Sequence, residues 1–151
     1  MALLAYLAIS DQEQSRETLA ALLWPELSER RARTNLRQAL SSVRQALGDD
    51  LLLASRTHVG IRHDPSLFVD VLAYRQLTSP RNGQSERLND LAPCIEPLTQ
   101  AVGLYTGDFL AGFTLPDCPE FDEWHFFQAE GLRRSLAHTL QTLIRWHSAG
   151  H

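Results

Sequence analysis

The sequence predicts a mainly α-helical fold that contains one short β-hairpin, and three observations lead to this prediction. Apolar residues recur at intervals of three and four in several segments, which is the spacing of one helix face. They alternate with a period of two only at residues 51–53 and 59–61, on either side of the polar turn 54–57. The chain has 151 residues, 44% hydrophobic and 21% charged. This is enough apolar material for one core, or for two small cores that share an interface.

The first part of the chain contains two short predicted helices. Residues 2–9 show helical periodicity from their start. Ser15 is the predicted N-cap of a second helix over 16–24, in which three leucines lie at helical spacing. Pro25 ends this helix, because the residue before a proline is pushed out of the helical region of backbone conformation.

A third and longer helix follows the turn formed by residues 25–27. Ser28 is its predicted N-cap, and the helix extends to about Leu47, with Gly48 as a left-handed C-cap. Two helices joined by so short a turn form a helix-turn-helix pattern. The hairpin comes directly behind the second of these helices, which is the position of the wing in a winged helix.

The second half of the chain is predicted to be helical, because no period-two pattern appears after the hairpin. Its predicted helices begin at 69–74, with Asp70 in the first turn, and then cover 86–105 and 120–147. Residues 79–84, 106–108 and 110–119 are predicted turns and loops. The apolar face of the last helix consists of Leu132, Leu136, Leu140 and Leu143. The sequence therefore predicts two domains, 1–64 and 65–151.

The charge of the chain is unevenly distributed. The whole chain carries a net charge of −4 and contains no lysine. Residues 28–62 hold seven arginines against three acidic residues, a local charge of +4, whereas residues 76–151 hold five arginines against nine acidic residues. A basic stripe on an otherwise neutral or acidic chain indicates a phosphate-binding face.

The predicted helix over 28–47 has an apolar face and a polar face that suits nucleic acid. Its candidate DNA-binding residues are Arg30, Arg33, Asn35, Arg37, Gln38, Ser41 and Arg44. Arginine can make bidentate hydrogen bonds to guanine in the major groove, and asparagine or glutamine can make them to adenine. Arg56 at the hairpin tip is a further candidate, for a phosphate or the adjacent minor groove. The alternative for all of these residues is an ordinary solvated surface.

Several motifs resemble those of the bacterial transcriptional activator family, which includes the Streptomyces antibiotic regulatory proteins. The motifs are Arg16-Glu17-x-Leu19-x-x-Leu22-Leu23-Trp24-Pro25, Arg31-Ala32-Arg33-x-Asn35-Leu36-Arg37-x-Ala39-Leu40-x-x-Val43-Arg44-x-Ala46-Leu47-Gly48, Asp70, Tyr105-x-Gly107-Asp108-Phe109-Leu110 and Trp124. They occur in the family's order and cover nearly all of the chain. The resemblance implies an OmpR-like winged helix joined to a helical domain related to tetratricopeptide repeats.

The same resemblance implies sequence-specific binding to double-stranded DNA, and contact of the helical part with RNA polymerase or with a second copy in a homodimer. Family members usually begin with a small antiparallel sheet and carry more helices after the position of Asp70, so the resemblance also implies a chain cut at both ends. A winged helix without that sheet is expected to expose apolar surface on its first helix and hairpin. The alternative function is therefore a helical protein–protein interaction scaffold that has lost DNA binding.

Other groups of residues indicate no specific chemistry. An acidic cluster is explained more simply by an acidic first turn of a helix than by a metal or hydrolase site; it consists of Asp117, Glu120, Asp122, Glu123 and His125. Nearby aromatic residues are predicted to pack in a core, with a partner-binding hot spot as the alternative; they are Phe113, Phe121, Trp124, Phe126 and Phe127. Cys94 and Cys118 lack the spacing of a metal site.

No catalytic motif and no glycine-rich phosphate loop is present in the sequence. We therefore expect a non-enzyme that uses no cofactor and no metal. No apolar run is long enough to span a bilayer, so the expected location is the cytoplasm, without a membrane partner. The expected function is that of a DNA-binding transcriptional regulator.

Overall fold

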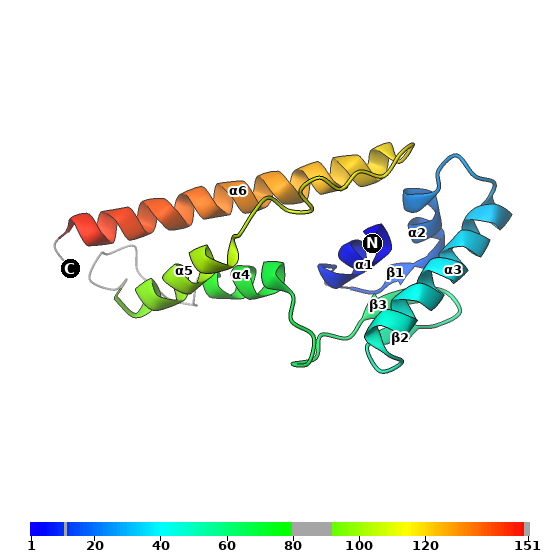
Figure 1. Ribbon diagram of the computed structural model, residues 1–151, viewed down its shortest axis with the longest axis horizontal. Helices are drawn as coiled ribbons and strands as arrows, with labels where there is room; N and C mark the ends of the chain where they lie inside the picture. Colours follow the sequence, from blue (N-terminus) through cyan, green and yellow to red (C-terminus); the bar gives the residue numbers. More distant parts are fainter. Residues whose placement is uncertain (11, 80–91, 150–151) are drawn as a thin grey trace. The chain divides into compact units, whose positions relative to one another are not determined.

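The computed structural model describes residues 1–10, 12–79 and 92–149, and Figure 1 shows the course of the chain. The described part is mainly helical and contains one small three-stranded antiparallel sheet. The prediction of a mainly α-helical chain with a β-hairpin is therefore confirmed. No helix in this part of the chain is long and apolar enough to cross a membrane.

The chain forms two compact units. Unit 1 comprises Met1–Phe68 and Phe113–Trp124, and unit 2 comprises Val69–Gly112 and His125–His151. The sequence places residues 113–124 in the second domain, whereas the contacts of this segment assign it to unit 1. One of these contacts is an aromatic pair in which the rings of Tyr6 and Trp124 lie 4.9 Å apart.

The described residues of unit 1 form the helices α1 (Ala2–Ala8), α2 (Arg16–Leu23) and α3 (Glu29–Leu47), followed much later by the start of α6. All three helices occur where the sequence predicts them. Ser15 caps α2, because its Oγ accepts a hydrogen bond of 3.0 Å from the backbone N of Thr18. Ser28 occupies the N-cap position of α3 but makes no side-chain capping bond. Gly48 follows α3 with a φ of +88°, which glycine adopts without strain.

The sheet of unit 1 has three strands, β1 (Gln14–Ser15), β2 (Leu52–Ala54) and β3 (His58–Ile61), in the order β1-β3-β2. The hairpin of β2 and β3 is confirmed, with Leu53 opposite Gly60. No pattern in the sequence predicts β1, because a strand of two residues is too short to show alternation. β1 pairs antiparallel with β3, opposite Val59 and His58.

The core of unit 1 is formed by all of its helices and by the hairpin. Its most deeply buried side chains are Leu7, Leu19, Leu36, Val59 and Phe121. The expectation of exposed apolar surface on the first helix and the hairpin is wrong. Leu3 and Leu7 of α1 are buried, as are Leu52 and Ile61 of the hairpin. The physical reason is that α1 packs against β3 and α2, so that these apolar side chains cover one another.

Unit 2 contains α4 (Asp70–Thr78), α5 (Ala92–Leu104) and most of α6 (Pro119–Ser148), which is the long orange-to-red helix in Figure 1. The helix predicted over 120–147 is confirmed, and Asp70 lies in the first turn of α4 as predicted. The predicted helix start at 86–91 and nearly all of the predicted loop 79–84 lie outside the described residues.

The core of unit 2 is centred on Tyr74, Ala101 and Leu132, which come from α4, α5 and α6. The buried Tyr74 hydroxyl lies 3.2 Å from Ser135 Oγ and 3.4 Å from Thr139 Oγ1. The predicted leucine face of α6 is only partly correct, because Leu132 is buried but Leu140 is 39% exposed. Thr139 takes a buried position instead, and its hydroxyl also donates to the Ser135 carbonyl oxygen at 2.9 Å.

Candidate nucleic-acid interface

Helix α3 is amphipathic, with an apolar face and a basic face on opposite sides. Its buried side chains lie at helical spacing on the side that faces the core of unit 1: Ala32, Leu36, Leu40 and Val43. The remaining surface is polar, and its four arginines predicted to bind DNA are all exposed: Arg30, Arg33, Arg37 and Arg44. Amphipathic periodicity fixes this arrangement, because burying the leucines turns the residues between them towards solvent.

Two of these arginines are engaged in ion pairs. Arg33 Nη2 lies 2.6 Å from Glu29 Oε1 and 3.1 Å from Glu17 Oε1, so it links α3 to α2. Arg44 Nε lies 3.2 Å from Asp49 Oδ1. All five side chains are at least half exposed. Exposed pairs of this kind contribute about 0–1 kcal/mol each, so a phosphate can displace the carboxylates at little cost.

The other two arginines are free of such pairs. Within the described part of the chain, Arg30 and Arg37 have no carboxylate partner. At about 100° per residue, the two lie about 20° apart around the helix axis, two turns from each other. Ser41 is exposed on the same stripe. These three residues form a continuous polar stripe on the solvent side of α3.

The two amide residues of the predicted set lie elsewhere on α3. Asn35 is half-buried and precedes Arg37 by two residues, which places it on a different side of the helix. The structure therefore does not bring Asn35 together with the basic stripe. Gln38 is exposed and lies about 100° from Arg37, at the margin of the stripe. Arg31, which is not in the predicted set, is also exposed.

The hairpin tip carries Arg56, which is exposed. The tip is held by Ser55, whose Oγ accepts hydrogen bonds from the backbone N of Thr57 at 3.3 Å and of His58 at 2.9 Å. Arg16, the first residue of α2, donates from Nε to the Ser55 carbonyl oxygen at 3.0 Å. Arg16 thus fixes the start of α2 to the hairpin. No signal in the sequence indicated this contact, because the two residues are 39 positions apart.

The acidic cluster near residue 120 lies around the start of α6. Glu120 and Asp122 lie in the first turn of α6, as the helix-dipole explanation predicts. In unit 2, His125 Nε2 lies 2.7 Å from the carbonyl oxygen of Phe109 and its ring packs on the Phe109 ring. Among the described residues, no group of three or more His, Cys, Asp or Glu side chains is placed to hold a metal ion.

The geometry of α3 can therefore support polyanion binding. Guanidinium groups present donors in a planar fork that matches phosphate and guanine. The exposed stripe with Arg30 and Arg37 leaves these donors open to solvent, and Arg56 adds a further exposed cation on the hairpin. Comparison with known proteins finds no matching family model and no matching curated protein.

Proposed function

We propose that unit 1 is a winged helix-turn-helix that binds double-stranded DNA, with α3 as the recognition helix in the major groove. The order of the elements, α1-β1-α2-α3-β2-β3, and the strand order β1-β3-β2 support this proposal, because they match the topology of a winged helix. In helix-turn-helix proteins the second helix presents its exposed residues to base edges. The hairpin with Arg56 would then lie over the adjacent backbone.

The proposal rests on the exposure of Arg30 and Arg37 and on their lack of a carboxylate partner in the described chain. Both are exposed on the side of α3 that points away from the core, and neither has a carboxylate partner in the described chain. Free guanidinium groups at this spacing can contact phosphates or guanine in a groove.

For unit 2 we propose a helical interaction domain of the kind that follows the winged helix in the bacterial transcriptional activator family. Its support is the resemblance of the Tyr105–Leu110 motif and the packing of α4 against α5 as a helix pair. The proposed partners are RNA polymerase or a second copy of the chain. The protein would then act as a cytoplasmic transcriptional regulator without a catalytic activity of its own.

The test is duplex binding by Arg37→Ala, measured by fluorescence anisotropy with a labelled mixed-sequence duplex at several salt concentrations. Each phosphate contact contributes about 0.9 to the slope of log K against log salt, so Arg37→Ala should lower the slope by about one. Arg31→Ala is the matched control. It removes the same charge from the same helix, but about 120° away around the axis.

Equal losses in the two variants would mean that α3 acts only through its total charge, and the recognition-helix assignment would then be wrong. Absence of salt-dependent DNA binding by the unaltered chain would reject the proposed function as a whole.

A second candidate function is a protein–protein interaction scaffold. It is favoured by Phe126 and Phe127 of α6, which are 59% and 61% exposed and whose rings lie 5.8 Å apart. Exposed aromatic pairs are typical anchors of protein interfaces. Light scattering on the sample used for DNA binding separates the two functions. Concentration-dependent association without salt-sensitive DNA affinity would favour the scaffold.

A further inference from the structure

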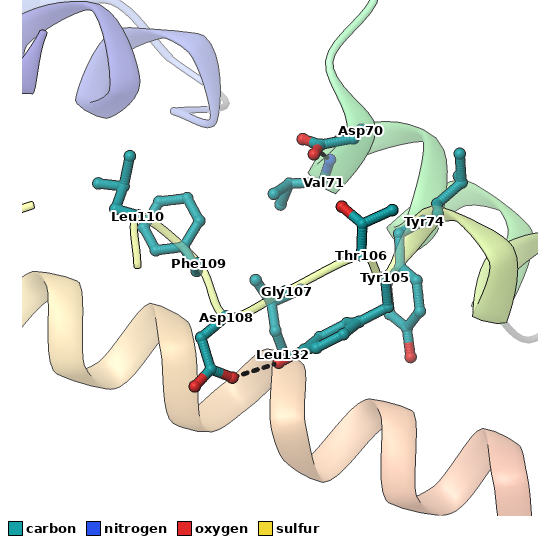
Figure 2. A pocket seen from close by; sticks show the side chains of 11 residues that line it. Asp70, Val71, Tyr74, Tyr105, Thr106, Gly107, Asp108, Phe109, Leu110 and Leu132 are labelled. Carbon is teal, nitrogen blue, oxygen red and sulfur yellow. Dashed lines mark hydrogen bonds between the residues drawn. The ribbon is translucent and has the colours of Figure 1, made fainter. Parts of the chain in front are cut away.

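Unit 2 contains a pocket formed by the start of α4, the end of α5, the loop after α5 and Leu132 of α6, shown in Figure 2. Its volume is about 220 Å³. A cavity of about 150 Å³ is sufficient to hold benzene. The pocket therefore has room for one six-membered ring, or a short branched chain, together with a small polar group.

The walls of this pocket are apolar and aromatic, and its charged groups are all acidic. Val71, Leu104, Phe109 and Leu132 supply apolar surface, and the ring of Tyr74 adds an aromatic face. The charged side chains among the lining residues are the carboxylates of Asp70 and Asp108, and no basic residue is among the lining residues. Figure 2 shows the Asp70 carboxylate on the α4 side and the Asp108 carboxylate on the α6 side.

The carboxylate of Asp108 is already satisfied by the protein. Arg133 donates to it twice, from Nη2 at 2.6 Å and from Nε at 3.1 Å, and the Tyr105 hydroxyl donates to it at 3.1 Å. These bonds, with those from Arg133 the stronger cause, hold the pKa of Asp108 below its ordinary value. Asp108 therefore fixes the loop after α5 in place and leaves little charge for a ligand.

The carboxylate of Asp70 differs from that of Asp108. Its Oδ1 accepts a hydrogen bond of 2.7 Å from the backbone N of Val71, and within the described part of the chain its second oxygen has no hydrogen-bond partner. Asp70 is exposed and lines the pocket. It therefore offers a free anionic acceptor beside an apolar cavity.

We propose that this pocket binds a small organic cation, namely a primary amine on an apolar body about the size of one ring. The ammonium group would pair with Asp70, and the apolar body would pack against Phe109, Leu104 and Tyr74. Aromatic faces also attract cations, which adds to the selection of a positive ligand. A ligand of the same size with a carboxylate would be repelled by Asp70. The proposal does not depend on DNA binding, because every lining residue belongs to unit 2.

Benzylamine is a suitable probe, with benzyl alcohol and benzoate as controls of the same shape but different charge. We expect benzylamine to shift the backbone amide signals of Val71 and Gly107 in two-dimensional NMR spectra of the full chain. The shifts should saturate with a dissociation constant on the order of 1 mM, because so small a ligand has few atoms to contribute. Benzyl alcohol should bind more weakly, and benzoate should cause no shifts.

Two matched variants test the role of Asp70. Asp70→Asn keeps an oxygen that can accept from the Val71 amide and removes the charge, so it should weaken benzylamine binding about three- to fivefold. Glu96→Gln removes one exposed carboxylate from α5 outside the pocket and should leave the affinity unchanged. The proposal is overturned if benzylamine gives no saturable shifts at these amides, if benzoate binds as well, or if the two variants weaken binding equally.

Discussion

The assignment of residues 113–124 to unit 1 leads to a sharp prediction about stability. Phe121 is fully buried, and its ring lies 6.1 Å from that of Phe113 and 5.1 Å from that of Trp124. Phe121→Ala removes a whole aromatic ring from this core and leaves a cavity. Substitutions of this kind lower the free energy of unfolding by about 3–5 kcal/mol. Because domains are stable by only about 5–15 kcal/mol, unit 1 should lose a large part of its stability.

The measurement is urea unfolding followed by tryptophan fluorescence. Trp24 and Trp124 lie in unit 1, whereas Trp146 lies in unit 2, so a Trp146→Phe background restricts the signal to unit 1. Phe126→Ala is the control, because it makes the same substitution five positions further along α6 at a side chain that is 59% exposed. It should change the free energy of unfolding of unit 1 by no more than about 0.5 kcal/mol.

A small or equal effect of the two substitutions would refute the reasoning. If Phe121→Ala costs less than about 1 kcal/mol, the ring does not contribute to the cooperative core of unit 1. Residues 113–124 would then be a connecting segment and not a structural part of that unit.

Two further predictions concern ion pairs. The double variant Glu17→Gln, Glu29→Gln removes both carboxylate partners of Arg33. Affinity for the DNA duplex should therefore rise about five- to tenfold at 0.1 M salt, and the slope of log K against log salt should steepen by about one. An unchanged affinity would show that Arg33 faces no phosphate. Arg133→Gln removes the main cause of the lowered pKa of Asp108, so NMR titration should find this pKa raised towards its ordinary value, with the Tyr105 hydroxyl still lowering it. A carboxyl group whose pKa is lowered by folding stabilises the folded state at pH values above its pKa in the unfolded chain. This stabilisation is lost as the pH falls through its pKa in the folded chain, so the variant should lose less stability on acidification. A pKa of Asp108 that is the same in the variant and the unaltered chain would contradict this.

The sequence alone predicted the helices and the hairpin of unit 1 because their signals are local. Ser15 and Pro25 mark the limits of α2 within ten residues of each other, and each acts on the backbone next to it. The long apolar period of α3 is likewise contained in the helix itself. The exposure of Arg30 and Arg37 follows from this period, so the basic stripe could be predicted without a structure.

Other features could not be predicted, because they depend on distant segments. β1 exists only through its pairing with β3, and its two residues carry no pattern of their own. The buried place of Thr139 depends on the hydroxyl of Tyr74, 65 positions earlier in the chain. The pocket beside Asp70 combines residues of α4, the loop after α5 and α6, which no spacing in the sequence relates.

The sequence by itself therefore determined where the helices and the hairpin form and which side of α3 carries its arginines. Only the tertiary structure decided that Arg33 also pairs with Glu17, because the packing of α2 against α3 brings these two side chains together, whereas its pair with Glu29 joins residues one helix turn apart. The physical reason is the separation along the chain over which each interaction acts. Helix periodicity and capping act over a few residues, but an ion pair needs two side chains within about 4 Å, and folding alone brings distant segments that close.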